Sequence, residues 1–270
     1  MDKAVAVIGH FDAVNEGASR RLLDAGCDIA RHAGRTQVIG PMDGNTWRRY
    51  RWVIDAGTEP PFMMEPFNPP EYPSWWRTAG FSPLAEYQSA LVTSLDGIDA
   101  RLSRVRERFA QQGIIIRTLD ASDFERELHR IFMVSTASFV NNLLYTPLSE
   151  TDFMAQYLPY RDKIIPDFVL LAMHDDRCAG YMFSIPDYYR HTSGNTLDTL
   201  IMKSAAILPD RCYAGMGNVM AEMTHHAAAS RGYRRVIHAL ALTDNPVTNI
   251  TAKYGQVMRR YTLFSSDLTP

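Results

Sequence analysis

The stretch that decides the fold runs over residues 207–218 and reads Ile-Leu-Pro-Asp-Arg-Cys-Tyr-Ala-Gly-Met-Gly-Asn. It joins a predicted strand at 199–208 to a predicted helix at 216–232, which Gly232 closes. Gly215 and Gly217 lie where this helix begins. Glycines there let backbone N–H groups approach an anion, and the helix N-terminus adds a partial positive charge. The pattern therefore predicts an anion-binding turn, and the alternative is a tightly packed turn without a ligand.

The loop differs from two common phosphate-binding motifs. It lacks the Lys-Ser/Thr pair of a Walker loop, and no third glycine follows between Asn218 and Met220, as a GxGxxG fingerprint would require. The predicted anion site is thus neither a P-loop nor a dinucleotide-binding turn.

The elements predicted after Gly113 give the order β-α-α-β-β-β-α-β-α-β. Ser122 with Glu125, and Ser149 with Asp152, are the expected N-terminal caps of the first two helices. The other predicted strands lie at 114–119, 167–173, 178–185, 234–242 and 258–264, and the last predicted helix at 248–255.

The N-terminal part predicts a separate strand-helix-strand unit. Residues 4–9 and 36–40 are expected to form parallel strands that a helix at 16–33 connects. Residues 55–73 contain six prolines among large apolar side chains, which excludes regular structure. We expect a loop packed across the surface, and the alternative is a wall of an apolar pocket. Further elements are a short helix at 74–81, a strand at 83–92 and an amphipathic helix at 96–112.

Composition excludes several classes of protein. The 270 residues are 46% hydrophobic, and 28 basic against 30 acidic side chains give a net charge of -2. The hydrophobic content excludes wholesale disorder. The net charge gives no overall positive field that could hold a nucleic acid. No apolar run is long enough to span a membrane, and the N-terminus lacks a secretory pattern. Cys27, Cys178 and Cys212 form no CxxC pair, so we expect a cytoplasmic protein without disulfides or metal.

The 207–218 loop resembles that of the GNAT superfamily of acyl-CoA N-acyltransferases, which reads approximately Pro-x-Tyr-Arg-Gly-x-Gly-x-Gly. Pro209, Gly215 and Gly217 are in register with that pattern. Cys212 and Tyr213 replace the usual Arg or Gln and the first Gly. The resemblance implies an α/β (α+β) fold of GNAT-like mixed sheets flanked by helices.

Two downstream residues extend the resemblance. Asn245 matches the Asn after the next strand, and Gly255 matches the Gly of the family's closing helix. The resemblance implies acetyl-CoA or another acyl-CoA as cosubstrate. The residues it implies for binding are Ala206, Ile207, Leu208, Cys212, Tyr213, Ala214, Gly215, Met216, Gly217, Asn218 and Asn245.

Direct acyl transfer needs a polarised thioester carbonyl, a base for the amine and an acid for the thiolate. The resemblance implies that a backbone N–H around residues 206–208 polarises the carbonyl. His238 is the candidate catalytic base, because the unperturbed pKa of histidine, about 6.5, suits proton transfer; a hydrogen-bonded core histidine is the alternative. Thr251 stands where the family often has its Tyr acid, which leaves the acid unassigned. Because Cys212 lies near a helix N-terminus, its thiol is expected to have a lowered pKa. The sequence shows no His or Asp partner for it, so a nucleophilic role is not expected.

The N-terminal part resembles the second half of the same fold. We therefore expect a tandem protein with a partial, degenerate lobe at 1–91, a linker helix at 92–112 and a complete lobe at 113–270. Asp12 and Glu16 occupy the counterpart of the glycine loop and would repel a pyrophosphate, so the first lobe is not expected to bind CoA. Its truncated sheet would expose a strand edge that pairs either with the second lobe or in a homodimer.

The predicted function is transfer of an acyl group from acyl-CoA to a small-molecule amine, with CoA in the C-terminal lobe. The alternative is a catalytically degenerate GNAT-like protein that binds an acyl or apolar ligand in a pocket between the lobes. The net charge disfavours a third option, transfer from aminoacyl-tRNA. The predicted strands at 199–208 and 234–242 should diverge if a pantetheine arm lies between them.

Overall fold

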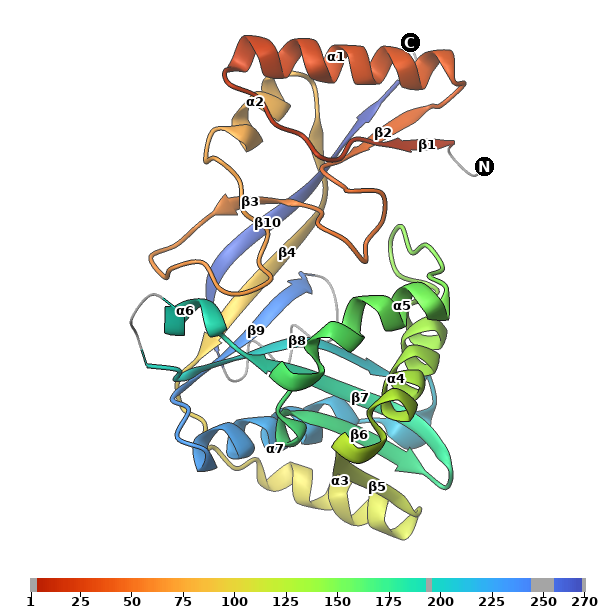
Figure 1. Ribbon diagram of the computed structural model, residues 1–270, viewed down its shortest axis with the longest axis vertical. Helices are drawn as coiled ribbons and strands as arrows, with labels where there is room; N and C mark the ends of the chain where they lie inside the picture. Colours follow the sequence, from red (N-terminus) through yellow and green to blue (C-terminus); the bar gives the residue numbers. More distant parts are fainter. Residues whose placement is uncertain (1–3, 193–195, 244–254, 269–270) are drawn as a thin grey trace. The chain divides into compact units, whose positions relative to one another are not determined.

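The computed structural model describes residues 4–192, 196–243 and 255–268 (Figure 1). The chain forms two compact units. Unit 1 comprises Met1–Ser89, Leu240–Asp244 and Val257–Pro270, and unit 2 comprises Ala90–Ala239 and Asn245–Gln256. Residues 257–270 thus belong to unit 1, whereas the sequence analysis assigns them to the second lobe. The assignment of one partial and one complete lobe stays a prediction.

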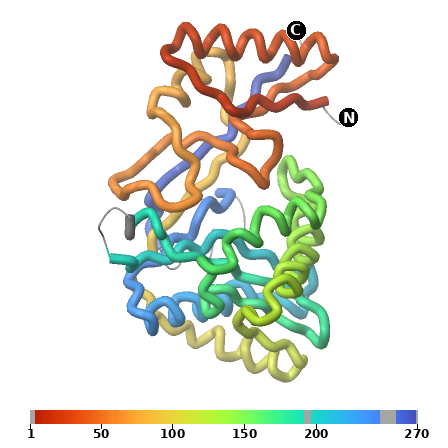
Figure 2. The backbone as a smooth tube through the Cα atoms, viewed as in Figure 1, coloured from red at the N-terminus to blue at the C-terminus, as the bar shows by residue number. Residues whose placement is uncertain are grey.

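Unit 1 is a mixed sheet with helices. Its strands are β1 (Val5–Val7), β2 (Gln37–Gly40), β3 (Trp52–Asp55), β4 (Ser82–Val92), whose last residues belong to unit 2, and β10 (Gln256–Asp267); its helices are α1 (Glu16–His32) and α2 (Tyr72–Thr78). β1 and β2 are parallel, as predicted. β10 runs antiparallel to both β2 and β3, so the C-terminal strand lies among N-terminal segments (Figure 2).

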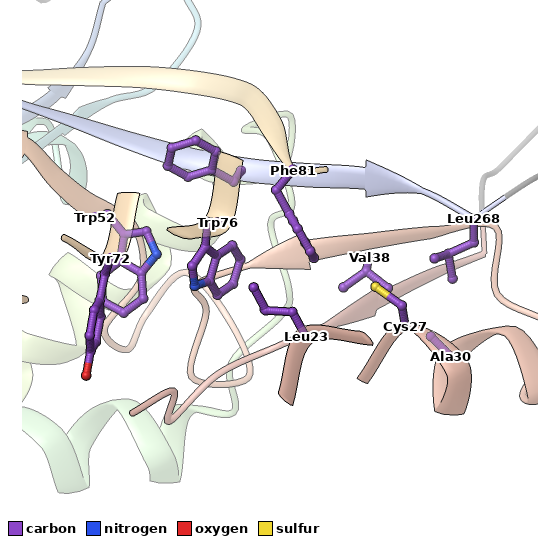
Figure 3. Packing of buried hydrophobic residues seen from close by; sticks show 10 residues of the cluster. Leu23, Cys27, Ala30, Val38, Trp52, Tyr72, Trp76, Phe81 and Leu268 are labelled. Atoms are coloured by element: carbon purple, nitrogen blue, oxygen red, sulfur yellow. The ribbon is translucent and has the colours of Figure 1, made fainter. Parts of the chain in front are cut away.

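The core of unit 1 is built around Trp76 of α2. Its side chain is fully buried, and its ring centroid lies 4.7 Å from that of Phe81 and 5.8 Å from that of Trp52 (Figure 3). A Cβ added to Gly40 would lie 2.6 Å from the Cη2 atom of Trp76. Glycine is therefore required at the end of β2, because the indole packs directly on its backbone.

The proline-rich loop at 55–73 is held by buried polar contacts. Asn68 accepts a hydrogen bond of 2.8 Å from the backbone N–H of Val53 in β3. Glu65 forms a buried ion pair of 2.6 Å with Arg259 of β10 and accepts a hydrogen bond from the hydroxyl of Tyr261. The loop is thus an ordered part of unit 1, because these contacts replace the backbone ladder that prolines exclude.

Unit 2 contains the remaining elements. Its strands are β5 (Ile114–Thr118), β6 (Val169–His174), β7 (Arg177–Pro186), β8 (Thr199–Ile207) and β9 (Arg235–Leu242), whose last residues belong to unit 1; its helices are α3 (Ala100–Gln111), α4 (Phe124–Phe139), α5 (Glu150–Tyr157), α6 (Tyr188–Thr192) and α7 (Met216–Ser230). The strand order is β9-β8-β7-β6-β5. β5 to β8 are antiparallel neighbours, whereas β8 and β9 are parallel.

Helices cover both faces of this sheet. The hydroxyl of Tyr181 on β7 lies 2.8 Å from Ser135 Oγ of α4. The neighbouring Gly180 faces α7, since a Cβ there would lie 3.0 Å from the Sδ atom of Met216. Successive strand residues point to opposite faces, so α4 and α7 lie on opposite sides of the sheet.

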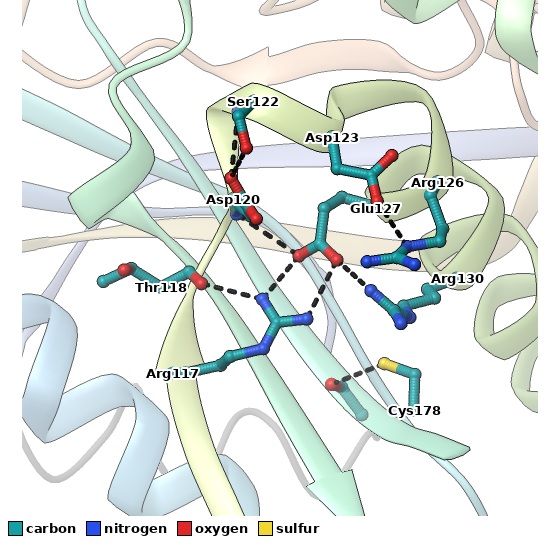
Figure 4. Close-up of polar contacts among 10 residues, drawn as sticks. Arg117, Thr118, Asp120, Ser122, Asp123, Arg126, Glu127, Arg130 and Cys178 are labelled. Carbon is teal, nitrogen blue, oxygen red and sulfur yellow. Dashed lines mark hydrogen bonds and ion pairs between the residues drawn. The ribbon is translucent and has the colours of Figure 1, made fainter. Parts of the chain in front are cut away.

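A buried carboxylate ties β5 to α4. Glu127 has no exposed side-chain surface, and Arg117 contacts its two oxygens at 2.6 and 2.9 Å (Figure 4). Arg130 donates to the same carboxylate. Burial acts to raise the pKa of Glu127, but the hydrogen bonds from the two arginines outweigh it and hold the pKa below its usual value.

The cap predicted at Ser122 is wrong. Asp120 accepts the backbone N–H of Ser122 at 2.9 Å and caps a short 3-10 turn. α4 begins only at Phe124, and its N-cap residue Asp123 makes no side-chain capping bond. The buried contacts of Glu127, rather than a capping box, fix the start of this helix.

Ser149 does cap α5, as predicted. Its hydroxyl accepts the backbone N–H of Asp152 at 3.1 Å. Replacing Ser149 by alanine is expected to lower the free energy of unfolding by about 1 kcal/mol, because an N–H of the first turn loses its acceptor. Urea unfolding followed by circular dichroism measures this loss. Ser149→Asp keeps an acceptor and should recover most of it, and equal losses in both variants would contradict the capping role.

Candidate functional site

The glycine loop connects β8 to α7 as the sequence predicts. After Ile207 the chain forms a short turn at Arg211–Tyr213, and Gly215 takes the left-handed conformation (φ 87°) directly before Met216 opens the helix. A Cβ at Gly215 would lie 3.1 Å from a methyl carbon of Val105 on α3. Both the backbone angle and this close approach require glycine.

Backbone N–H groups gather at the N-terminus of α7. The first helical hydrogen bond that its cap residue accepts comes from Val219, whose N–H lies 3.1 Å from the carbonyl oxygen of Gly215. The N–H groups of Met216, Gly217 and Asn218 precede it, so the helix itself offers them no acceptor. Together with the helix dipole, these donors can bind an anionic group.

β8 and β9 pair over only part of their length. Their parallel ladder runs from Thr199 opposite Arg235 to Met202 opposite His238, whereas β8 continues to Ile207 along β7. Beyond Met202 and His238, the described residues of the two strands share no further paired positions. The N–H of Leu208, directly after β8, donates to the carbonyl of Ala179 in β7 at 2.8 Å. Because donors alternate along a strand, the N–H of Ile207 points toward the other edge.

His238, the predicted catalytic residue, occupies the last paired position of β9. Its Nε2 lies 2.9 Å from Nε2 of His225 on α7, and both rings are buried and nearly parallel. One ring therefore donates the shared proton and the other accepts it. Burial and, to a smaller extent, the nearby His225 lower the pKa of His238 to about 3. His238 was predicted to be a base because an unperturbed histidine has a pKa of about 6.5. In the buried site its pKa is well below that value.

Comparisons with known proteins rest on structure alone. No protein-family model and no curated protein matches the chain. A GCN5-related N-acetyltransferase from Sphaerobacter thermophilus is similar with a TM-score of 0.57 and 13% identity, over 100% of this chain and 75% of that one. A glucosamine N-acetyltransferase region of a fungal multi-domain β-N-acetylglucosaminidase has a TM-score of 0.55 and 10% identity, over 91% of this chain and 27% of that one. A GCN5-related N-acetyltransferase from Anabaena variabilis has a TM-score of 0.50 and 10% identity, over 95% of this chain and 52% of that one.

The chain has the GNAT fold. Identities this low show the fold and leave the reaction open. The GNAT fold accounts for the mixed α/β architecture that the loop at 207–218 led us to expect.

Cys212 and Tyr213, two of the residues predicted to bind the cosubstrate, have side chains that contact other residues of the protein. The Tyr213 hydroxyl lies 3.0 Å from Nδ1 of His174, at the end of β6. Desolvation and the hydrogen bond to Asp210 raise the pKa of the Cys212 thiol. The suggestion of a lowered thiol pKa is therefore wrong, because Asp210 accepts the Cys212 N–H at 2.9 Å and sets a negative charge beside the sulfur.

The remaining predicted residues divide into two groups. Ala206 and Ile207 end β8 and Leu208 follows it, whereas residues 214–218 form the mouth of α7. The structure thus brings both groups to one strand-loop-helix segment. Asn245, Thr251 and residues 248–254 of the helix predicted at 248–255 lie outside the described residues.

No group of three or more His, Cys, Asp or Glu side chains among the described residues is placed to hold a metal ion. In the same part of the chain, no helix is long and apolar enough to cross a membrane.

A cavity of about 340 Å³ in unit 1 was not predicted as a site. It lies where β1 and β2 end, and Phe67, Pro69 and Tyr72 from the proline-rich loop and the start of α2 contribute to its wall. The alternative interpretation of that loop, the wall of an apolar pocket, agrees with this contribution only in part, because charged residues line the same cavity. The polar residues of the cavity come from the segments at 10–12 and 43–51. Asp12 was expected only to repel a pyrophosphate, and the others belong to no motif.

Proposed function

We propose that the protein transfers an acyl group from acyl-CoA to a small-molecule amine, with the cosubstrate bound in unit 2. The observation that carries the proposal is the end of the β8–β9 ladder at Met202 and His238, which leaves residues 203–207 of β8, before the glycine loop, unpaired with β9. An unpaired strand edge offers backbone donors and acceptors to the amides of a pantetheine arm. The outward N–H of Ile207 is the proposed donor to the thioester carbonyl.

The N-terminus of α7 is the proposed pyrophosphate site. The N–H groups of Met216, Gly217 and Asn218 lie at the helix mouth, and a helix dipole favours negative charge there. The guanidinium of Arg108 on α3 donates to the carbonyl of Ala214 and brings a positive charge close to the loop. Such a local site agrees with a chain whose net charge is only -2.

In the proposed reaction the amine nitrogen attacks the thioester carbon, the C–S bond breaks, and the nitrogen loses one proton. His238 is the proposed base. A ring with a pKa of about 3 is too weak to deprotonate a free ammonium. Its proposed role is the step after attack, which demands less of a base because nitrogen bound to a tetrahedral carbon is more acidic than a free ammonium. Asn245 is proposed to bind the cosubstrate as the family resemblance implies, and the acid for the thiolate stays unassigned.

The second candidate function is a catalytically degenerate GNAT-like protein that binds an acyl or apolar ligand. The weak basicity of His238 and the threonine at position 251 favour it. Calorimetric titration with acetyl-CoA, followed by thiol release in the presence of a panel of amines, separates the two candidates. Binding with turnover supports acyl transfer, and no binding at millimolar acetyl-CoA would exclude it. A cytoplasmic location and a homodimer are parts of the proposal that fractionation and sedimentation would test.

Gly217→Asp is expected to weaken acetyl-CoA binding by about tenfold or more, because the new carboxylate would face the pyrophosphate. An acidic residue in the first turn of a helix stabilises it by about 0.3–1 kcal/mol, so lost binding could not be attributed to unfolding. Gly217→Asn is the matched control, with nearly the same size and no charge. Equal affinities of the two variants, measured by calorimetry, would remove the pyrophosphate from this site.

A further inference from the structure

The cavity of unit 1 has the composition of a small-molecule site. Five aromatic rings and two prolines share its wall with five charged or titratable residues. Its volume of about 340 Å³ is at the lower end of the range for ligand pockets, which begins at about 300 Å³. It lies beside the carboxyl ends of the parallel strands β1 and β2, where α/β sheets commonly bind ligands.

Arg51 is a buried cation without an anionic partner among the residues that the structure describes. Its side chain is only 6% exposed, and its guanidinium lies 3.9 Å from the ring centre of Tyr50 and 4.1 Å from that of Tyr87. It donates one hydrogen bond, of 3.1 Å, to the carbonyl of Leu240. No carboxylate of the described chain lies within ion-pair distance of it. A buried guanidinium with unused donors beside a cavity calls for an anionic ligand group.

The backbone holds Arg51 in this position at a cost. Its φ of 73° lies in the left-handed region, which is uncommon for a residue other than glycine. Its N–H bonds the carbonyl of Pro41 at 2.9 Å, and the two tyrosine rings fix the guanidinium plane. Strained residues of this kind are frequent at ligand sites. Here the strained residue is an arginine that lines the cavity.

The opposite charge lines the same cavity. The Tyr72 hydroxyl donates to one oxygen of Asp12 at 2.5 Å, and the second oxygen has no partner among the described residues. Asp43 accepts the N–H of His10 at 2.7 Å, and its other contacts are the exposed side chains of His10 and Arg49 at 3.8 and 4.0 Å. Exposed pairs of this kind contribute little, so both carboxylates stay available to a cation.

An exposed aromatic ring completes the wall. Phe67 contributes to the lining although its residue surface is 71% exposed. Phe11 and Trp52 line the cavity as well and pack edge to face with centroids 6.0 Å apart. These rings offer a planar apolar body a contact surface, whereas the two carboxylates oppose a phosphorylated ligand.

We propose that unit 1 binds a free amino acid with an aromatic side chain. Arg51 binds the carboxylate, Asp12 binds the ammonium group, and Phe67 contacts the ring. The site is made by residues of unit 1 alone and does not rest on acyl transfer in unit 2.

Calorimetry on the full chain without acyl-CoA tests the proposal with L-phenylalanine, L-tyrosine and L-tryptophan as probes. At least one of them should bind with a dissociation constant below about 1 mM, a modest affinity for a site with two charge-assisted contacts. 3-Phenylpropanoate lacks the ammonium group and phenethylamine lacks the carboxylate, so each should bind the phenylalanine site at least about tenfold more weakly than the amino acid. No binding of any amino acid at 10 mM, chosen as about ten times that limit, would overturn the proposal, and so would equal binding of 3-phenylpropanoate.

Variants test which residues make the site. Arg51→Gln, Asp12→Asn and Phe67→Ala should each weaken amino-acid binding by about tenfold. The last two change exposed residues, so they keep the proposal testable if loss of Arg51 impairs folding. Arg48→Gln removes an exposed arginine that does not line the cavity and should leave the affinity unchanged. Unchanged binding in both Asp12→Asn and Phe67→Ala, or a loss of the same size in Arg48→Gln, would exclude this site.

Discussion

Replacing Trp76 by alanine is expected to lower the free energy of unfolding of unit 1 by about 3–5 kcal/mol. The indole is fully buried between Trp52, Phe81 and Phe264, and Gly40 leaves no side chain that could fill the resulting cavity. Urea unfolding followed by circular dichroism gives the loss. Two transitions are expected if the units unfold separately, and only the one that belongs to unit 1 should shift.

Trp75 provides a matched control on the same helix. It is only partly buried and lies at the margin of the same cluster. Trp75→Ala should therefore lower the free energy of unfolding by clearly less than Trp76→Ala, because fewer packing contacts are lost. If both variants lost the same stability, the core of unit 1 would not be centred on Trp76.

The sequence predicted local structure better than long-range pairing. The helices at 16–32 and 216–230 match their expected ranges closely, because apolar spacing and capping residues act within one turn. β3 was missed, since Trp52–Asp55 is too short to show a pattern and is held by β10, more than 200 residues later in the chain. The pairing of β10 with β2 had no local signal for the same reason.

The candidate site shows the same division. The glycine loop could be predicted because the left-handed backbone before α7 requires a glycine, and Gly215 is visible in the sequence at the start of the helical pattern. The environment of His238 was not, since its partner His225 faces it only through the packing of α7 on the sheet. The burial of Arg51 could not be predicted either, because its contacts with Tyr87 and Leu240 join residues that are far apart in the sequence.

The buried histidine pair predicts a strong pH dependence of stability. Burial lowers the pKa of His225 to about 4 and that of His238 to about 3, whereas both should titrate at about 6.5 in the unfolded chain. Below pH 6.5 the unfolded state takes up protons that the folded state refuses, so stability falls as the pH falls. Each such histidine costs about 1.4 kcal/mol per pH unit in that window. Between pH 7 and pH 5 the pair should lower the free energy of unfolding by about 4 kcal/mol.

His238→Gln is expected to remove about half of this loss, because one of the two titrating groups is gone while the glutamine amide can still hydrogen-bond His225. Urea unfolding at pH 7, 6 and 5 gives the difference for each variant. His32→Gln changes an exposed histidine of α1 and should leave the loss between pH 7 and pH 5 as it is in the unmodified protein. An identical loss in His238→Gln and the unmodified protein would mean that His238 is not held neutral by burial, and it would restore the ring as an ordinary base for acyl transfer.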